Sequence, residues 1–153
     1  MKLTRATVRS PFGRFVVEGD DDGLTRIYLP HEEASATKAW SDPVRSAAKQ
    51  LEEYFAGERT DFDVDLHVAA TDFQVDVWSA LMTVPYGQVV TYQDIARAVG
   101  RPRAFRAVGN ANGKNPFPVI VPCHRIVASN GLGGYAGGLS VKRALLALEG
   151  VSY

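Results

Sequence analysis

The hydrophobic pattern of the chain changes near residue 70, and this change limits the folds that are open to it. Before that point, apolar and polar residues alternate with the period of β-strands in short runs between residues 3 and 29. Turn residues separate these runs, so they predict a small antiparallel meander. One amphipathic helix is predicted over residues 43–55, with Pro43 in its first turn and Gly57 after its end.

After residue 70 the pattern is that of short helices, each followed by Gly or Pro. Thr71 and Gln74 have the spacing of a capping box, and Thr91 is the expected N-cap of the next helix. A further helix is predicted to begin at Pro102, so that residues 99–102 join two helices in a helix-turn-helix. The whole chain is therefore predicted to be α+β.

The two patterns predict two domains, residues 1–70 and residues 71–153, with the charged residues 58–70 as a connector. The net charge of the chain is zero, but the halves differ. Residues 1–70 contain 9 Lys/Arg and 13 Asp/Glu, a net charge of −4, and residues 71–153 contain 8 and 4, a net charge of +4. This asymmetry fits either a basic half that binds a polyanion or two halves that attract each other.

The chain contains no run of about 20 apolar residues, the length that a membrane-spanning helix needs. Lys and Arg residues interrupt the first 16 residues, so a signal peptide is not expected. The single cysteine fits a reducing compartment. We therefore expect a soluble, cytoplasmic protein.

That single cysteine, Cys123, lies in the sequence Val-Pro-Cys-His-Arg. Residues 119–121 before it are predicted to form a short buried strand or extended run. Because His124 and Arg125 follow directly, we expect an environment that favours the thiolate, which is the nucleophilic form of cysteine. A simply buried structural cysteine is the alternative.

Two glycine-rich stretches accompany the cysteine. Residues 131–138 include five glycines around Tyr135, which allows backbone N–H groups to approach a ligand closely. The helix that follows Pro102 carries only small residues on much of its surface, with basic residues around it. This bare surface fits either a nucleic-acid groove or close packing on a neighbouring helix. The last helix is predicted over residues 140–148.

Together these motifs resemble the O6-alkylguanine-DNA alkyltransferase family, single-turnover proteins that repair alkylated guanine. The resemblance covers about half the chain, from Phe73 to Gly150. The motifs that carry it are Pro85-Tyr86-Gly87, Thr91-Tyr92-Gln93-Asp94-Ile95-Ala96, Arg106-Ala107-Val108-Gly109, Asn115-Pro116, Ile120-Val121-Pro122-Cys123-His124-Arg125 and Tyr135-Ala136-Gly137-Gly138-Leu139. It implies a ribonuclease H-like N-terminal domain and a winged-helix-like C-terminal domain with a helix-turn-helix.

The resemblance also implies a role for each catalytic position. Cys123 would accept the alkyl group, with His124 as its base through a water molecule and Glu149 orienting the imidazole. Asn115 would link the segment before Cys123 to the helix-turn-helix by side-chain hydrogen bonds. Tyr92 would supply a proton or hydrogen bond to the leaving guanine.

Further positions are implied to contact the substrate, which must be flipped out of the duplex to react. The base pocket would be lined by Tyr135, Ala136, Ile126 and Pro118. Arg106 would fill the space left in the base stack, and the bare helix would lie in the minor groove. The other DNA contacts would come from Ala107, Gly109, Gln93, Arg101 and Ser129.

The implied partner is double-stranded DNA that contains O6-alkylguanine, bound by a monomer without a cofactor and without a membrane, in the cytoplasm of a prokaryote. Some relatives hold a structural zinc ion with N-terminal cysteines. Here that half contains no cysteine, and His31 and His67 stand alone, so we predict no metal site.

Two other functions compete with alkyl transfer. A DNA-damage sensor would use the helix-turn-helix and leave Cys123 idle. A Cys–His hydrolase would act on small acyl substrates with many turnovers.

Overall fold

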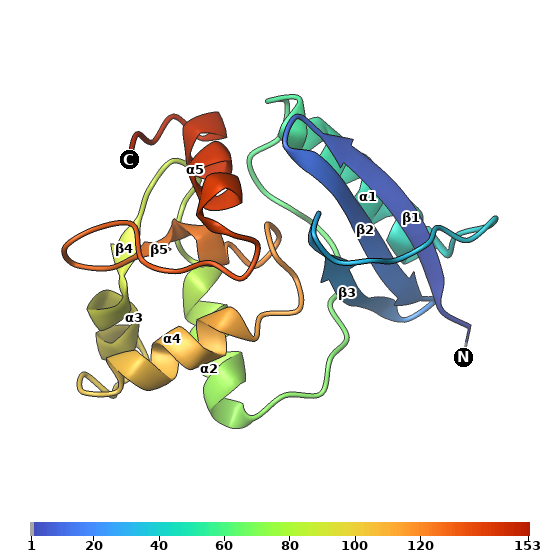
Figure 1. Cartoon of the computed structure of the whole chain (residues 1–153). Coiled ribbons are helices and arrows are strands. Elements are labelled where there is room, and N and C mark those ends of the chain that lie inside the picture. Colours follow the sequence, from blue (N-terminus) through green and yellow to red (C-terminus); the bar gives the residue numbers. More distant parts are fainter. Residues whose placement is uncertain (1) are drawn as a thin grey trace. The chain divides into compact units, whose positions relative to one another are not determined.

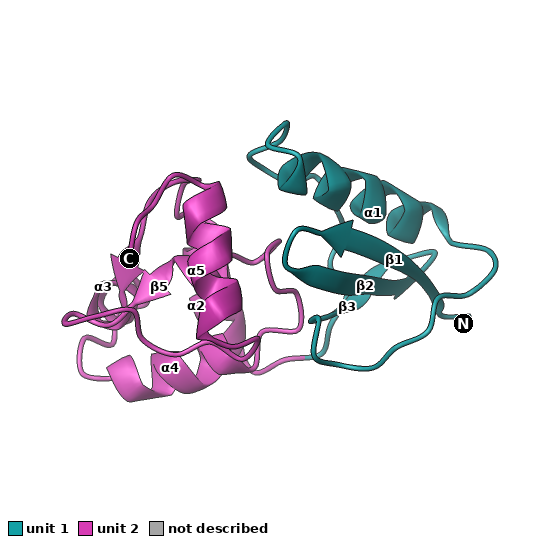
Figure 2. Ribbon diagram, turned by 45° about the horizontal axis from the view of Figure 1, so that its top comes forward, with its two compact units in different colours: residues 1–69 teal, residues 70–153 magenta. Residues whose placement is uncertain are grey.

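The computed structural model of the chain describes residues 2–153. It divides into two compact units, residues 1–69 and residues 70–153 (Figure 2). The first unit contains one helix and the three-stranded sheet, and the second contains the other α-helices and the two-stranded sheet (Figure 1).

The first unit is a three-stranded antiparallel sheet with one helix. The strands β1 (Thr4–Ser10), β2 (Gly13–Asp20) and β3 (Gly23–Tyr28) pair in the order β1-β2-β3. Helix α1 (Asp42–Phe55) packs on β1 and β2. The meander and the helix predicted from the alternation and from Pro43 are thereby confirmed.

Alternation along the strands gives this unit its core. Ala6 and Val8 of β1 pair with Val17 and Phe15 of β2, and all four side chains are buried. The ring of Phe15 stacks on Phe55 of α1 with 5.1 Å between the ring centroids. The period-two pattern therefore places one face of the sheet against the helix.

The second unit is mostly helical. It contains α2 (Asp72–Leu81), α3 (Tyr92–Ala98), α4 (Phe105–Gly113) and α5 (Leu139–Leu148). A short parallel pair, β4 (Val90–Thr91) with β5 (Ile126–Val127), ties the start of α3 to the segment after Cys123. A single-turn 3-10 helix, η1 (Cys123–Arg125), carries the cysteine motif itself.

Both predicted helix caps are present. The hydroxyl of Thr71 accepts from the backbone of Gln74, and that of Thr91 accepts from Asp94, each in a complete capping box. Behind them, the indole of Trp78 in α2 donates to the carbonyl of Ala111 in α4 at 2.9 Å. This buried bond links the first helix of the unit to the second helix of the helix-turn-helix.

Two local predictions are wrong. Helix α4 begins at Phe105 and not at Pro102, because residues 101–104 form a turn that a bond from Ala104 N to Arg101 O closes. Proline suits the second position of such a turn as well as the first turn of a helix.

The predicted extended run at residues 119–121 is the second error. It is a tight buried turn, closed by a bond from Val121 N to the Phe117 carbonyl at 2.9 Å. Val119 has a φ of 76° there, a conformation that a β-branched residue rarely adopts. Since its side chain is almost fully buried, packing in the core offsets the backbone strain.

Candidate active site

Cys123 begins η1 and is 5% exposed. Burial raises the pKa of its thiol, and three neighbours act in the opposite direction. These are the polar side chains of Asn115 and Tyr135 and the positive charge of Lys142. The expectation of a resting thiolate is therefore wrong: burial outweighs these three effects, so the cysteine is held as a thiol that a base must deprotonate.

Asn115 holds the conformation of the turn that precedes Cys123. Its Nδ2 donates to the Val121 carbonyl at 2.9 Å, and its Oδ1 accepts from the backbone N–H of Phe117 at 2.9 Å. One side chain thus closes the turn before η1 and also acts to lower the pKa of the thiol. The two polar side chains that act on the sulfur come from the segment after α4 and from the glycine-rich loop.

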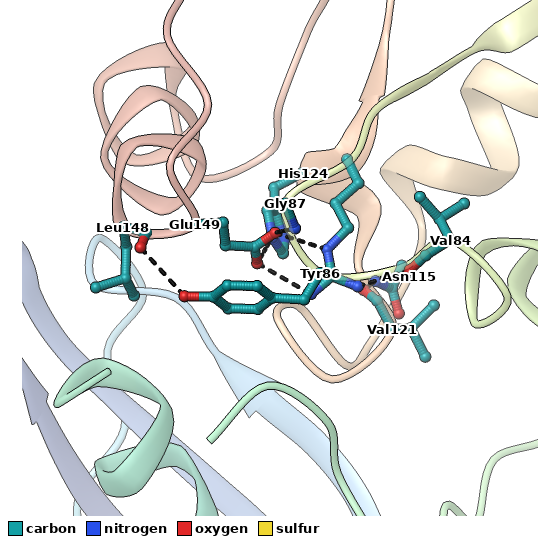
Figure 3. Close-up of polar contacts among 9 residues, drawn as sticks. Val84, Tyr86, Gly87, Asn115, Val121, His124, Leu148 and Glu149 are labelled. Carbon is teal, nitrogen blue, oxygen red and sulfur yellow. Dashed lines mark hydrogen bonds and ion pairs between the residues drawn. The ribbon is translucent and has the colours of Figure 1, made fainter. Parts of the chain in front are cut away.

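The imidazole of His124 is fully buried against Glu149, the C-cap of α5. Its Nε2 lies 2.8 Å from Glu149 Oε2, and Figure 3 shows the carboxylate facing both the imidazole and the Gly87 backbone. The Gly87 N–H donates to Glu149 Oε1 at 3.0 Å. The carboxylate accepts from the imidazole, which fixes a tautomer with the proton on Nε2.

Arg125 completes this cluster by a two-bond pairing with the same carboxylate. Its Nε and Nη2 lie 2.9 and 3.0 Å from the two Glu149 oxygens, and its Nη1 donates to the Val84 carbonyl at 2.8 Å. The guanidinium is therefore directed at Glu149, and the expectation that it stabilises the neighbouring thiolate is wrong. Lys142 is the cation that acts on the sulfur.

Burial lowers the pKa of His124, with Arg125 and Lys142 acting in the same direction and Glu149 against it. The imidazole is thus neutral near pH 7, as a base must be. With Nε2 bonded to Glu149, the other ring nitrogen, Nδ1, carries the free lone pair. It is buried and meets no hydrogen-bond partner among the described residues.

Lys142 on α5 is a buried cation; the position fits the family resemblance, but sequence reasoning gave it no role. Its ammonium donates to the carbonyls of Ile126 at 2.6 Å, Leu132 at 2.7 Å and Gly134 at 3.0 Å. Burial lowers its pKa to about 8, so the ammonium form still predominates near pH 7. It joins β5 to the glycine-rich loop and places a positive charge beside the thiol.

A groove of about 360 Å³ runs between α3, α4 and the loop after β5. Five predicted site residues line it together: Tyr92, Gln93, Arg106, Gly109 and Ser129. The ring of Tyr92 also approaches the glycine-rich loop, where a Cβ added to Gly133 would lie 3.0 Å from the tyrosine hydroxyl. With a φ of 76° and this close contact, Gly133 has two reasons to be glycine.

The bare surface of α4 is not required by packing within the unit. A Cβ added to Gly113 would meet nothing within 4 Å, and one added to Gly109 would meet only the Tyr92 ring at 3.8 Å, an ordinary contact. Ala107 is exposed. Ala107, Gly109 and Gly113 therefore leave an open face, whereas Ala111 is buried, and the open face favours an external partner over close packing on a neighbouring helix.

The remaining predicted residues lie around this arrangement. Pro118 is buried in the turn that Asn115 closes, and the Ile126 carbonyl already accepts from Lys142. Ala136 is exposed in the glycine-rich loop. Arg101 is exposed outside the groove, with its guanidinium 5.6 Å from the centroid of the Phe73 ring.

Residues 2–153 offer neither a cluster of metal ligands nor a membrane-spanning helix. No group of three or more His, Cys, Asp or Glu side chains in that part of the chain is arranged to hold a metal ion. Within the same residues, no helix has the length and apolar character to cross a membrane.

Comparison with known proteins identifies the family. Residues 72–151 match the model described as 6-O-methylguanine DNA methyltransferase, DNA binding domain. Residues 3–68 match the model of the ribonuclease-like domain of the same methyltransferase. The chain belongs to this methyltransferase family. The resemblance inferred from the motifs around Cys123 is confirmed, and it extends to the N-terminal half.

Relatives within the methyltransferase family cover nearly the whole chain. A methylated-DNA–protein-cysteine methyltransferase of Methanosarcina acetivorans is 45% identical over 151 residues, which cover 95% of this chain and 97% of the relative. One of Mycobacterium bovis is 48% identical over 148 residues, with 94% and 90% covered.

Solved structures of the family share the fold. The O6-methylguanine methyltransferase of Mycobacterium tuberculosis has a TM-score of 0.84 at 46% identity, covering 97% of this chain and 93% of that one. A second structure of the mycobacterial protein, in complex with DNA, has a TM-score of 0.82 at 49% identity, with 94% and 90% covered. The predicted α+β class, with a ribonuclease-like part and a helical part, is confirmed.

Proposed function

We propose that the chain repairs DNA by transferring the alkyl group of O6-alkylguanine irreversibly to Cys123, as a methylated-DNA–protein-cysteine methyltransferase. The observation that carries the proposal is the surroundings of Cys123 in a chain of this family. Asn115, Tyr135 and the charge of Lys142 act to lower the pKa of a buried thiol against the effect of burial, and a neutral imidazole paired with a carboxylate follows it directly. This is the arrangement of an activated nucleophile.

The proposed chemistry is a single displacement. His124 takes the thiol proton at Nδ1 through a bridging water, and the imidazolium that forms is stabilised by Glu149 at 2.8 Å. The sulfur then attacks the alkyl carbon, a carbon–sulfur bond forms, and the bond to guanine O6 breaks. The leaving guanine receives a proton, for which Tyr92 is the proposed donor.

The product explains why the protein would act once. A thioether on a saturated carbon has no leaving group that water can displace under these conditions, unlike the acyl–sulfur bond of a cysteine hydrolase. Asn115 and Tyr135 stabilise the thiolate during attack but offer no route back. Each molecule would therefore remove one lesion.

The groove and α4 are the proposed DNA-binding face. Arg106 is exposed at the groove and would enter the base stack in place of the flipped nucleotide. The open surface at Ala107 and Gly109 would let the backbone of α4 approach the minor groove. The other proposed contacts are Gln93, Ser129 and Arg101, and the proposed base-pocket residues are Tyr135, Ala136, Ile126 and Pro118.

These roles assign binding and catalysis to residues 71–153 of a monomer that acts without a cofactor. The proposed location is the cytoplasm of a prokaryote, where its DNA lies.

The test is a count of lesions removed per protein molecule, with an excess of duplex DNA containing O6-methylguanine. We expect one lesion removed per molecule, followed by no further reaction. Continued turnover would favour a hydrolase, and binding of damaged DNA with no lesion removed would favour a damage sensor. Either result would reject the proposal.

A further inference from the structure

Asn112, near the end of α4, connects the DNA-binding helix to the cysteine. The residue is 6% exposed, and its Nδ2 donates to the backbone carbonyl of Cys123 at 3.4 Å. The amide thus lies beside the residue that carries the nucleophile. Sequence reasoning gave Asn112 no role.

The other half of this amide has no partner. Its Oδ1 is buried and accepts no hydrogen bond from any of the described residues. The opposite assignment of the amide oxygen and nitrogen would not satisfy the side chain either. It would place Oδ1 against the Cys123 carbonyl, and both oxygens are acceptors. A buried acceptor without a donor destabilises a fold, so its presence here needs an explanation.

We propose that Asn112 recognises the flipped base by accepting a hydrogen bond at Oδ1 from the exocyclic amino group of guanine. This inference rests on the proposed function. O6-alkylguanine offers this amino group as its donor, whereas its ring nitrogens are acceptors. O4-alkylthymine has no amino group, so Asn112 would favour alkylated guanine over alkylated thymine.

A purely structural role is the alternative. The bond from Nδ2 to the Cys123 carbonyl would serve to hold α4 against η1, and it would not distinguish one substrate from another. The two roles therefore make different predictions. Only the recognition role predicts that changing Asn112 alters the effect of the exocyclic amino group on the rate of transfer.

The test combines a protein change with a substrate change. Single-turnover rates are measured on duplex DNA with O6-methylguanine and with O6-methylhypoxanthine, which lacks only the amino group. In the unchanged protein, we expect the amino group to speed transfer. In Asn112→Leu, we expect the ratio of the two rates to fall about five- to tenfold, the effect of one hydrogen bond. Some preference remains, because the family resemblance also implies that backbone carbonyls near Cys123 and Ile126 accept from the amino group.

Asn110→Leu is the matched control, because Asn110 is an exposed asparagine on the same helix. Its rates are expected to change by the same factor on both substrates. Asn112→Ala serves as a second variant if Leu is not accommodated, and circular dichroism shows whether each variant is folded.

Two results would overturn the inference while alkyl transfer itself stands. One is a rate ratio in folded Asn112 variants equal to that of the unchanged protein. The other is equal rates on the two bases in the unchanged protein. If the unchanged protein removes the alkyl group from neither base, the proposed function fails instead.

Discussion

At the scale of single residues, the site depends on a carboxylate shared by three donors. Glu149 binds His124, Arg125 and the Gly87 backbone at once, and its side chain is fully buried. The Glu149 carboxylate therefore holds the imidazole of His124 in place, and the guanidinium of Arg125 neutralises the negative charge of the carboxylate. Removing one member leaves a buried charge without its partner, which costs far more than the loss of an exposed ion pair.

Arg125→Leu tests this difference. We expect the variant to lower the free energy of unfolding by about 3–5 kcal/mol, because Glu149 loses its two-bond partner in a buried position. Urea unfolding measures the change. The control is Arg45→Leu, which breaks an exposed pair with Asp42 and is expected to have far less effect. Equal losses in the two variants would contradict the assigned strength of the buried cluster.

Arg106 is the residue whose role depends on duplex DNA. Because it is proposed to fill the stack only when a base has been flipped, Arg106→Ala should slow repair of duplex DNA at least about tenfold, a typical loss for one unstacking contact. Reaction with free O6-benzylguanine should change little. Arg143→Ala, an exposed arginine on α5, serves as the control for charge. Equal slowing on duplex and free base would remove Arg106 from the flipping step.

At the scale of elements, α5 carries more of the site than its sequence first indicates. Lys142, Leu145, Leu146 and Glu149 follow one another at helical spacing, so the apolar stripe and the two charges lie on one buried face. The apolar spacing predicted the helix over residues 140–148 and nothing of its two charged positions. The same spacing applied to the charged positions would have indicated that Lys142 is buried and therefore paired.

Lys142→Met tests the cation on this face. The change keeps the length of the side chain but leaves three carbonyls without a donor and removes the charge beside the thiol. We expect the pKa of Cys123 to rise further and transfer to slow. Thiol absorbance during a pH titration measures the first effect and single-turnover rates the second.

Lys49→Met, at an exposed lysine of α1, should leave the thiol titration unchanged. An unaltered titration in Lys142→Met would show that the ammonium acts only on the loop.

The elements also show where prediction from sequence stops. Strands, caps and most helix ends depend on local spacing and on residues such as Thr71 and Thr91. The predicted caps at Thr71 and Thr91 are confirmed. The turn at residues 117–121 and the start of α4 depend on long-range packing and on the two uses of proline, which the sequence does not distinguish.

The candidate site was predictable only in part for the same reason. Cys123, His124 and Glu149 follow from the family motifs. Other contacts join residues that are far apart in the sequence, and local motifs do not reveal them. They are the pairing of Arg125 with Glu149 and the hydrogen bonds that Lys142 and Asn112 donate. The direction of the thiol pKa also depends on burial, which adjacent charges alone did not reveal.

At the scale of the whole molecule, stability should depend on pH through His124. Its pKa is lowered from 6.5 in the folded state, whereas the unfolded chain retains the ordinary value. Below pH 6.5 the unfolded chain therefore binds a proton that the folded one does not, and stability falls as the pH falls. One such group lowers the free energy of unfolding near pH 5.5 by up to about 1.4 kcal/mol relative to neutral pH.

This dependence is measured by urea unfolding at about pH 7.5 and pH 5.5. Trp78 fluorescence in a Trp40→Phe background reports the second unit alone, since these are the two tryptophans of the chain. His124→Gln should reduce the pH-dependent loss, whereas His31→Gln, at an exposed histidine, should not. The same loss in both variants would show that His124 is not the titrating group.

The proposed alkyl transfer depends on which residue carries the alkyl group after the reaction. Intact-protein mass spectrometry after exposure to O6-benzylguanine measures this directly, with peptide mapping to locate the modification. We expect one benzyl group per molecule, carried by Cys123 and absent from Cys123→Ser. A chain that stays unmodified, or one whose added mass lies on another residue, would contradict it.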